Sequence, residues 1–145
     1  MNIAFVSCTS CGKKNRVPAD KQHLFPKCGH CKTPINMTNQ AIPVELGDQT
    51  FHDFVKQVSL PVLVDFFSPT CGPCQRMLPI VNAIARKHAN RFIIATVDTS
   101  KNHGISSFFN IRSVPRFMFF KDGRLIDQIS GAVPQDILEK KLTSL

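Results

Sequence analysis

Residues 62–74 read VLVDFFSPTCGPC, which is an apolar run followed by a short loop and two cysteines. The run 62–67 has the length of one buried strand, and Asp65 is its only polar residue. Beyond the cysteines, apolar residues recur at the spacing of one helix face: Met77, Ile80, Val81 and Ile84. The segment therefore predicts a buried strand, a loop, and a helix that begins at the cysteines.

Cys71 and Cys74 stand where this placement favours redox chemistry. At a helix N-terminus, unpaired N–H groups and the helix dipole stabilise an anion, so the Cys71 thiolate becomes the nucleophile. Cys74 lies one turn further on the same face, close enough to form a disulfide. Pro73 suits a first helical turn because it has no N–H to leave unpaired. The alternative is half of a metal site, but a lone pair lacks two ligands.

The sequence on either side of this segment alternates between helix and strand patterns. A helix is expected over 51–58 with Asp48 as its cap, and an edge strand near Val44. The remaining predicted elements are a strand at 92–97, a short helix at 105–109, a hairpin of 117–120 and 125–129 that turns at 122–123, and a closing helix that ends at Leu145. Strands separated by helices predict the α/β class, with a central mixed sheet and helices on both faces.

Asp65 is unusual because a lone acid inside a buried strand is costly unless it is paired or works. Burial would raise its pKa and suit it to exchange a proton. The alternative is an acid that faces outward at the strand end. We favour the functional interpretation.

The first 36 residues have a different character. They are poor in aliphatic side chains and cannot bury enough apolar area to fold without a stabilising cross-link or bound metal. We expect three parts: a small N-terminal domain over 1–36, a linker over 37–43 and a second domain over 44–145.

Four cysteines can supply this stabilisation. Cys8 and Cys11 form one Cys-x-x-Cys pair and Cys28 and Cys31 another, separated by the gap typical of a four-thiolate zinc site. Such a site is closed and therefore structural, holding one Zn²⁺. Glycines at 12 and 29 are expected to relieve the two turns. Two disulfides are the alternative, which a reducing compartment disfavours, and the spacing leaves an iron site open.

The net charge of +8 is concentrated at the N-terminus, where residues 1–43 hold six basic side chains and one acidic. A basic arm can bind nucleic acid, but lysines beside four thiolates also offset the charge of a metal site, and we favour that interpretation. No stretch approaches the length of a membrane-spanning helix, and the N-terminus does not resemble a signal peptide. We expect a cytoplasmic protein that makes no contact with a membrane.

Residues 42–145 resemble the thioredoxin family. The resemblance rests on 62–67, the Cys71-Gly-Pro-Cys74 motif, Pro79, Val114-Pro115, FFKDG at 119–123 and GA at 131–132. Together with the N-terminal cysteine pairs, which resemble a zinc ribbon, the chain is similar to the zinc-containing thioredoxin 2 branch found in bacteria.

The resemblance implies a set of residue roles. Cys71 is the attacking cysteine and Cys74 the resolving cysteine. Asp65 is the buried acid beneath them, which relays a proton to or from Cys74, and Pro115 is a cis proline that faces the pair. It also implies a monomeric protein-disulfide reductase that NADPH-dependent thioredoxin reductase recharges. No organic cofactor is expected in this chain.

Four positions depart from the family pattern. Thr70 and Phe67 stand where tryptophan is usual, Gln75 where a cation is common, and Ile94 where the family has a lysine beside the buried acid. Without that lysine, the pKa of Asp65 should rise further, and Arg76 and Arg116 are candidate sources of positive charge.

One alternative function comes from a different class. The N-terminal arm could be a zinc-ribbon module that binds nucleic acid or protein through a redox-sensitive metal site. We expect no nucleic-acid binding, because few aromatic side chains accompany the lysines. The sequence does not identify the disulfide substrates.

Overall fold

The structure is a computed structural model that describes all residues except 1–2, 19–20, 22–23, 25, 36–41 and 89–90. The predicted linker over 37–43 lies mostly outside the described residues. The strands of the described residues form two sheets, one of two strands and one of five.

The N-terminal sheet is a hairpin of β1 (Ile3–Ser7) and β2 (Lys14–Pro18), paired antiparallel so that Ser7 lies opposite Lys14. Among its described residues the buried cluster consists of Val6, Cys8, Val17, Cys28 and Ile35, and two of these are cysteines. That residues 1–36 need an added stabilising element to fold stays a prediction.

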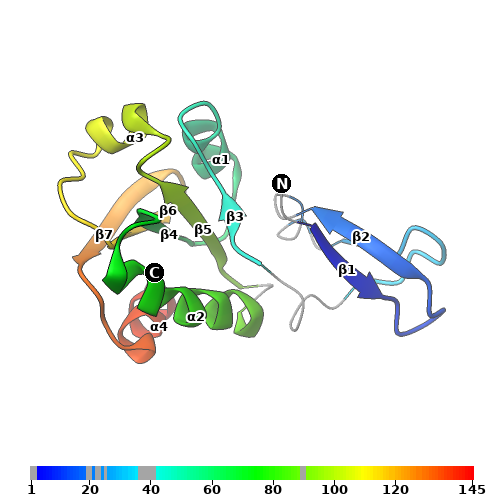
Figure 1. Cartoon of the computed structure of the whole chain (residues 1–145). Helices are drawn as coiled ribbons and strands as arrows, with labels where there is room; N and C mark the ends of the chain where they lie inside the picture. The colour runs from blue at the N-terminus through cyan, green and yellow to red at the C-terminus, as the bar shows by residue number, and fades with distance from the viewer. Residues whose placement is uncertain (1–2, 19–20, 22–23, 25, 36–41, 89–90) are drawn as a thin grey trace.

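The five-stranded sheet has the order β3-β5-β4-β6-β7 (Figure 1). Its strands are β3 (Val44–Glu45), β4 (Val62–Phe67), β5 (Ile93–Asp98), β6 (Arg116–Lys121) and β7 (Arg124–Ser130). The first three strands run parallel, whereas β6 and β7 form the predicted antiparallel hairpin. The tight turn falls at Asp122 and Gly123, both of which have positive φ.

Helices cover both faces of this sheet (Figure 1). Two pack on one face, α1 (Phe51–Gln57) and α3 (His103–Phe108), and two on the other, α2 (Gly72–Lys87) and α4 (Gln135–Thr143). Alternation along β4 explains the division, because Val64 belongs to the first core cluster and Leu63 to the second. Asp65 therefore faces α2.

Asp48 does not have its predicted role. Thr50 is the N-cap residue of α1 and makes no side-chain cap hydrogen bond. The Asp48 carboxylate instead accepts hydrogen bonds from the backbone N–H groups of Gly104 (3.2 Å) and Ile105 (2.8 Å). It therefore caps α3, a helix more than fifty residues away in the sequence.

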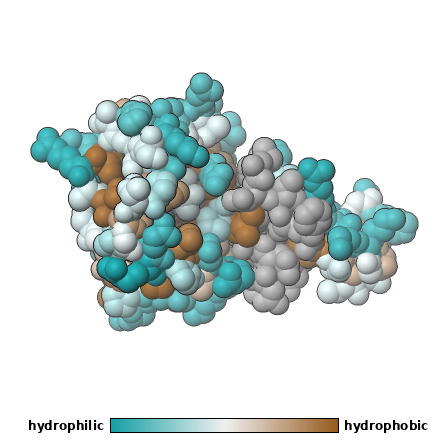
Figure 2. Space-filling view, viewed as in Figure 1, coloured by the Kyte–Doolittle hydropathy of each residue, from teal (hydrophilic) through white to brown (hydrophobic). Residues whose placement is uncertain are grey.

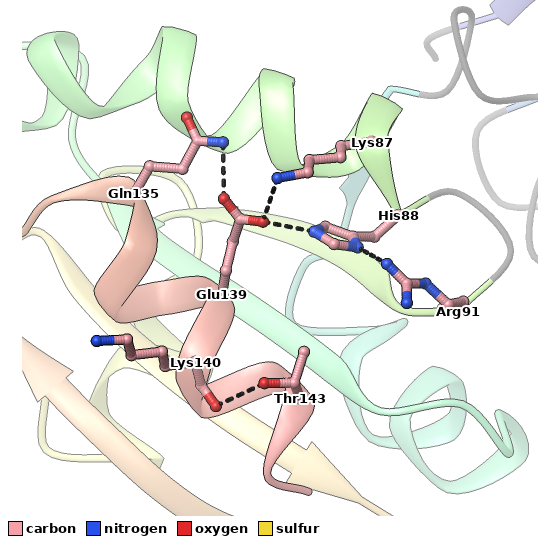
Figure 3. A network of polar contacts seen from close by, with 7 residues as sticks. All are labelled: Lys87, His88, Arg91, Gln135, Glu139, Lys140 and Thr143. Atoms are coloured by element: carbon pink, nitrogen blue, oxygen red, sulfur yellow. Dashed lines mark hydrogen bonds and ion pairs between the residues drawn. The ribbon is translucent and has the colours of Figure 1, made fainter.

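A polar network joins the end of α2 to α4 (Figure 3). The Glu139 carboxylate accepts hydrogen bonds from Lys87 (3.0 Å), His88 (2.7 Å) and Gln135 (2.9 Å). The Arg91 guanidinium can only donate, so His88 Nδ1, 2.6 Å away, accepts a hydrogen bond from it. The N–H of His88 is then at Nε2 and donates its hydrogen bond to the Glu139 carboxylate. The His88 bond is the main reason why the pKa of Glu139 falls to about 2.

Hydrophilic and apolar side chains mix on the face of the molecule shown in Figure 2. No helix within the described residues has both the length and the apolar character needed to cross a membrane.

Candidate active site and metal site

The Cys71–Cys74 pair lies at the N-terminus of α2, as the sequence predicted. The two cysteines form a disulfide, with their Cα atoms 5.2 Å apart. Cys71 is the N-cap residue, and its Sγ accepts a hydrogen bond from the Cys74 N–H at 3.1 Å. The same N–H is available to stabilise a Cys71 thiolate in the reduced protein.

The two sulfurs differ in access. Cys71 is half-buried, whereas Cys74 is only 4% exposed and lies behind it. Pro73 lies in the first helical turn as predicted. An incoming disulfide can therefore reach Cys71 but not Cys74.

The loop before β6 also lies close to the cysteines. The Val114–Pro115 peptide bond is cis, and the Val114 carbonyl oxygen lies 3.6 Å from Cys71 Sγ. Pro115 is buried, and its carbonyl accepts a hydrogen bond from Gly131 N–H at 2.8 Å. The segments 114–115 and 131–132 quoted for the resemblance therefore meet beside the disulfide.

Asp65 is buried in the middle of β4, with 2% of its surface exposed. It does not face outward at the strand end, so that alternative is wrong. Within the described part of the chain its Oδ1 has no hydrogen-bond partner, and desolvation raises the pKa of Asp65 to about 7. Near neutral pH this carboxyl group can therefore both accept and give up a proton.

Asp65 and Cys74 border the same cavity, which has a volume of about 400 Å³. Its other walls come from α2, from the end of β4, from β5, and from β3 with the two residues before it: Ile42, Pro43, Glu45, Phe67, Gln75, Leu78, Asn82, Arg86 and Thr96. A cavity of this size holds ordered water when polar groups line it. Water in it can carry a proton between the thiol of Cys74 and the carboxylate.

The departures from the family pattern have local consequences. Thr70 is exposed, 3.2 Å from the Ser68 hydroxyl, and Gln75 donates to the Pro69 carbonyl at 3.1 Å, so both stabilise the loop before Cys71. Ile94 is buried in the core under α2.

Neither candidate cation borders the cavity. Arg116 donates to Gln128 at 3.1 Å, and Arg76 is exposed near Gly72. The cation that does line the cavity is Arg86, which the sequence analysis did not single out. Its helical spacing from Gln75 was the only available signal.

The N-terminal cysteines converge on one point. Their four Sγ atoms all lie within 4.8 Å of one another, and the pairs Cys8–Cys31 and Cys11–Cys28 are 3.6 Å apart. Four sulfurs around a tetrahedral zinc ion at ~2.3 Å would be about 3.8 Å apart, so the donor set fits this metal. All four cysteines are free, which excludes the two-disulfide alternative for this state of the protein.

The two cysteine turns repeat the same backbone pattern. In each turn, the first cysteine's carbonyl oxygen accepts a 2.9 Å hydrogen bond, from Gly12 in one turn and Lys32 in the other. Both of these residues have positive φ, +76° and +65°. The prediction for Gly12 is therefore confirmed, whereas that for Gly29 is wrong, because the left-handed position of the second turn is occupied by Lys32.

The sulfurs cannot all ionise easily without a cation. Hydrogen bonds from the Cys31 backbone and the Asn15 side chain are the main reasons why the pKa of Cys28 falls to about 5. A backbone hydrogen bond from Lys13 lowers the pKa of Cys11, but desolvation and the neighbouring sulfurs outweigh it and raise the value to about 11. A metal ion would neutralise this repulsion.

A dithiol at a helix N-terminus, a buried acid beneath it and a mixed sheet behind both define the class of thiol–disulfide oxidoreductases. The thioredoxin family model matches residues 42–144, so the chain belongs to the thioredoxin family. A second family model, described as thioredoxin 2, N-terminal, is a zinc ribbon and matches residues 7–33.

Individual relatives agree with this assignment. Thioredoxin C-3 of Corynebacterium nephridii is 36% identical over 88% of this chain and 86% of its own. Thioredoxin 1 of Synechococcus elongatus is 39% identical over 70% of this chain and 95% of its own. Among solved structures, a mutant thioredoxin from Halobacterium salinarum superposes with a TM-score of 0.65 and 28% identity, covering 71% of this chain and 89% of that one. The protein is a protein-disulfide reductase of the thioredoxin type.

Proposed function

We propose that Cys71 attacks the substrate disulfide and that Cys74 resolves the mixed disulfide. The observation that supports these roles most directly is the difference in access, since Cys71 is half-buried and Cys74 almost fully buried. The hydrogen bond from the Cys74 N–H to Cys71 Sγ supports a stabilised thiolate on Cys71 in the reduced protein.

The reaction proceeds in two exchanges. The Cys71 thiolate attacks one sulfur of the substrate disulfide, forms a bond to it and releases the other sulfur as a thiolate. Cys74, once deprotonated, then attacks Cys71 Sγ and releases the second substrate sulfur. The substrate gains two electrons and becomes a dithiol, and the protein loses two and holds the Cys71–Cys74 disulfide.

Asp65 is the proposed acceptor of the Cys74 proton. The two residues share a cavity, and the raised pKa of Asp65, about 7, suits exchange at neutral pH. The protonated carboxyl group afterwards returns its proton to a departing thiolate or to water.

Val114 and Pro115 are proposed to align the substrate. The Val114 carbonyl, 3.6 Å from Cys71 Sγ, is available to accept a backbone hydrogen bond from a substrate strand. Pro115 is proposed to keep this approach clear, since a bulky trans residue there would block it.

The reductant is proposed to be NADPH-dependent thioredoxin reductase, and the substrates are proteins with accessible disulfides. Family membership supports both, and it supports action as a monomer in the cytoplasm. The four free cysteines of the N-terminal cluster are compatible with a reducing compartment.

The metal is proposed to be one structural Zn²⁺ held by Cys8, Cys11, Cys28 and Cys31. The sulfur spacing and the zinc-ribbon match support it. Bound zinc would supply folding energy to the arm and take no part in the redox step. We further propose that 1–36 and 44–145 are separate domains joined by 37–43.

The test of the two cysteine roles is disulfide reduction of insulin with thioredoxin reductase and NADPH. Cys71→Ser should abolish turnover because no nucleophile remains. Cys74→Ser should also lose turnover but trap a mixed disulfide that a thiol reductant releases. Multiple turnover by Cys74→Ser would refute the two-step mechanism.

A binding role for the arm is a second candidate. Six cations of the arm are exposed: Lys13, Lys14, Arg16, Lys21, Lys27 and Lys32. Salt-sensitive binding to RNA or DNA that survives loss of both Cys71 and Cys74 would support this role. Nucleic-acid binding that any added anion weakens equally would oppose this role.

A further inference from the structure

The cavity under Asp65 has two further charged groups on its walls. These are Glu45 from β3 and Arg86 from α2, and no other described residue that lines the cavity is basic. Both side chains are exposed, and both border the same space as the buried carboxyl group.

Sheet register places Glu45 beside Asp65. Glu45 lies opposite Thr96 in the β3–β5 pair, and Thr96 lies opposite Asp65 in the β4–β5 pair. The three residues form one row across three strands and therefore share the sheet face that α2 covers. With neighbouring strands ~4.8 Å apart, the Glu45 and Asp65 backbones are about 10 Å apart.

Helix geometry directs Arg86 towards the same point. Gln75, Leu78, Asn82 and Arg86 recur at intervals of three or four residues and line the cavity as one stripe. Arg86 lies eight residues beyond Leu78, about 12 Å along the axis. Helical side chains lean towards the N-terminus, so the long arginine side chain extends back along the stripe towards Asp65.

The chain has a need for such a cation. Asp65 must be a carboxylate before it can take the proton from Cys74, in a site that otherwise disfavours charge. Asp65 Oδ1 has no hydrogen-bond partner among the described residues, and Ile94 provides no charge on this face of β5. Arg86 is the lining residue able to stabilise the carboxylate through the cavity.

We propose that Arg86 and Glu45 are positioning residues of opposite sign for the proton on Asp65. Arg86 favours the carboxylate, which draws the proton from Cys74, and Glu45 favours the protonated acid, which releases it less readily. This inference rests on the proposed role of Asp65 as the acceptor of the Cys74 proton.

The test is a ¹³C NMR titration of the Asp65 carboxyl carbon in the reduced full-length protein. Arg86→Gln should raise its midpoint by about half a pH unit, and Glu45→Gln should lower it by about as much, because a unit charge ~9 Å away acts with this strength through partly hydrated protein. Arg86→Lys should leave the midpoint of the parent protein unchanged. The double variant Arg86→Gln with Glu45→Gln should have a midpoint close to that of the parent.

Arg124→Gln is the matched control. Arg124 is exposed on β7 and does not line the cavity, so the substitution removes the same charge from a different place. It should leave the midpoint unchanged. If Arg86→Gln and Glu45→Gln fail to move the midpoint, or move it in the same direction, the inference is wrong.

Turnover separates this inference from the role on which it rests. The pH profile of insulin reduction should shift in the direction of the NMR midpoint for each variant. Midpoints that move while the profile stays fixed would uphold the electrostatic roles of Arg86 and Glu45 and refute proton relay by Asp65. The opposite result is a pH profile that changes in Asp65→Asn while the NMR midpoints stay fixed in the Arg86 and Glu45 variants. It would uphold proton relay by Asp65 and refute the electrostatic roles of Arg86 and Glu45.

Discussion

The same Cys-x-x-Cys spacing serves two different purposes in this molecule. In the N-terminal turns, the sulfurs of Cys8 and Cys28 accept hydrogen bonds from the backbone N–H two residues on, and each turn presents its sulfurs to the other turn. At the start of α2, Cys71 accepts from the N–H of Cys74 itself, and the two sulfurs bond to each other. The backbone that follows the first cysteine decides between these outcomes.

A helix after the first cysteine brings the second back to the same face, and its dipole favours one thiolate. A turn that reverses the chain keeps both sulfurs available to a second pair, with which they can complete a tetrahedron. The surroundings differ as well, since α2 packs on a large apolar core, whereas the buried residues described beside the turns include Cys8 and Cys28 themselves. Packing therefore stabilises the redox turn, and we expect metal to stabilise the other.

Removal of the metal is expected to have the largest effect on this contrast. Structural zinc contributes on the order of 10 kcal/mol to the folding of small modules, so a strong chelator should unfold the arm. Amide NMR signals of the arm should collapse while those of 42–144 persist, and disulfide reduction should continue. In the mirror-image control, Cys71→Ser should leave the metal content at one ion per chain in native mass spectra. Loss of the 42–144 signals on chelation would contradict the independence of the two units.

Asp65→Asn should show that ionisation of this buried acid lowers the stability of the redox region. The pKa of Asp65 is about 7 in the folded protein, against an ordinary value of 3.8 for a free group, so folding disfavours its ionised form. Its contribution is neutral below pH ~4, becomes unfavourable as the pH rises towards 7, and reaches a limit of about 4 kcal/mol above that.

Urea unfolding measures this effect. Asn resembles the protonated acid, so the free energy of unfolding of the variant should match that of the parent at pH 4 and exceed it at pH 8. An equal difference at both pH values would mean that ionisation is not the cause.

The network around Glu139 tests whether contacts within the protein anchor the redox helix. The pKa of Glu139 is lowered from 4.5 to about 2, chiefly by His88, so its stabilising contribution is present above pH ~4.5 and disappears as the pH falls through about 2. For a partly solvated pair this contribution is about 1 kcal/mol. Glu139→Gln should therefore lower the free energy of unfolding of residues 44–145 at pH 7, and this effect should be much smaller at pH 2, whereas the metal affinity of the arm should not respond.

The smallest expected effects concern the two equivalent turn positions, Gly12 and Lys32. An added Cβ at Gly12 meets no atom within 4 Å, but its φ of +76° is unfavourable for alanine. Gly12→Ala should therefore cost about 1 kcal/mol, or about fivefold in zinc affinity measured against a competing chelator. Lys32→Gly should improve the affinity slightly. The control Gly29→Ala should be neutral because its Cβ would make only an ordinary 3.8 Å contact with Asn15.

The sequence by itself determined the elements of residues 44–145 and both cysteine sites, but it did not predict β1 or β2. The apolar run 62–67, the helix spacing after Cys71 and the turn at 122–123 are local patterns, and each produced the predicted element because neighbouring residues alone create it. The spacing of the four N-terminal cysteines likewise predicted their convergence. Element ends moved by one or two residues, as at β5, which begins at Ile93 rather than 92.

Only the tertiary structure decided which distant residues meet. Asp48 caps α3 rather than α1 because the fold brings Gly104 and Ile105 to its carboxylate. Arg86 and Glu45 share a cavity with Asp65 because the strand order puts β3 beside β5 and α2 above both β4 and β5. Periodicity records how a residue relates to its own element, whereas these contacts depend on sheet order and register. Long-range packing sets both, so no local pattern contains them.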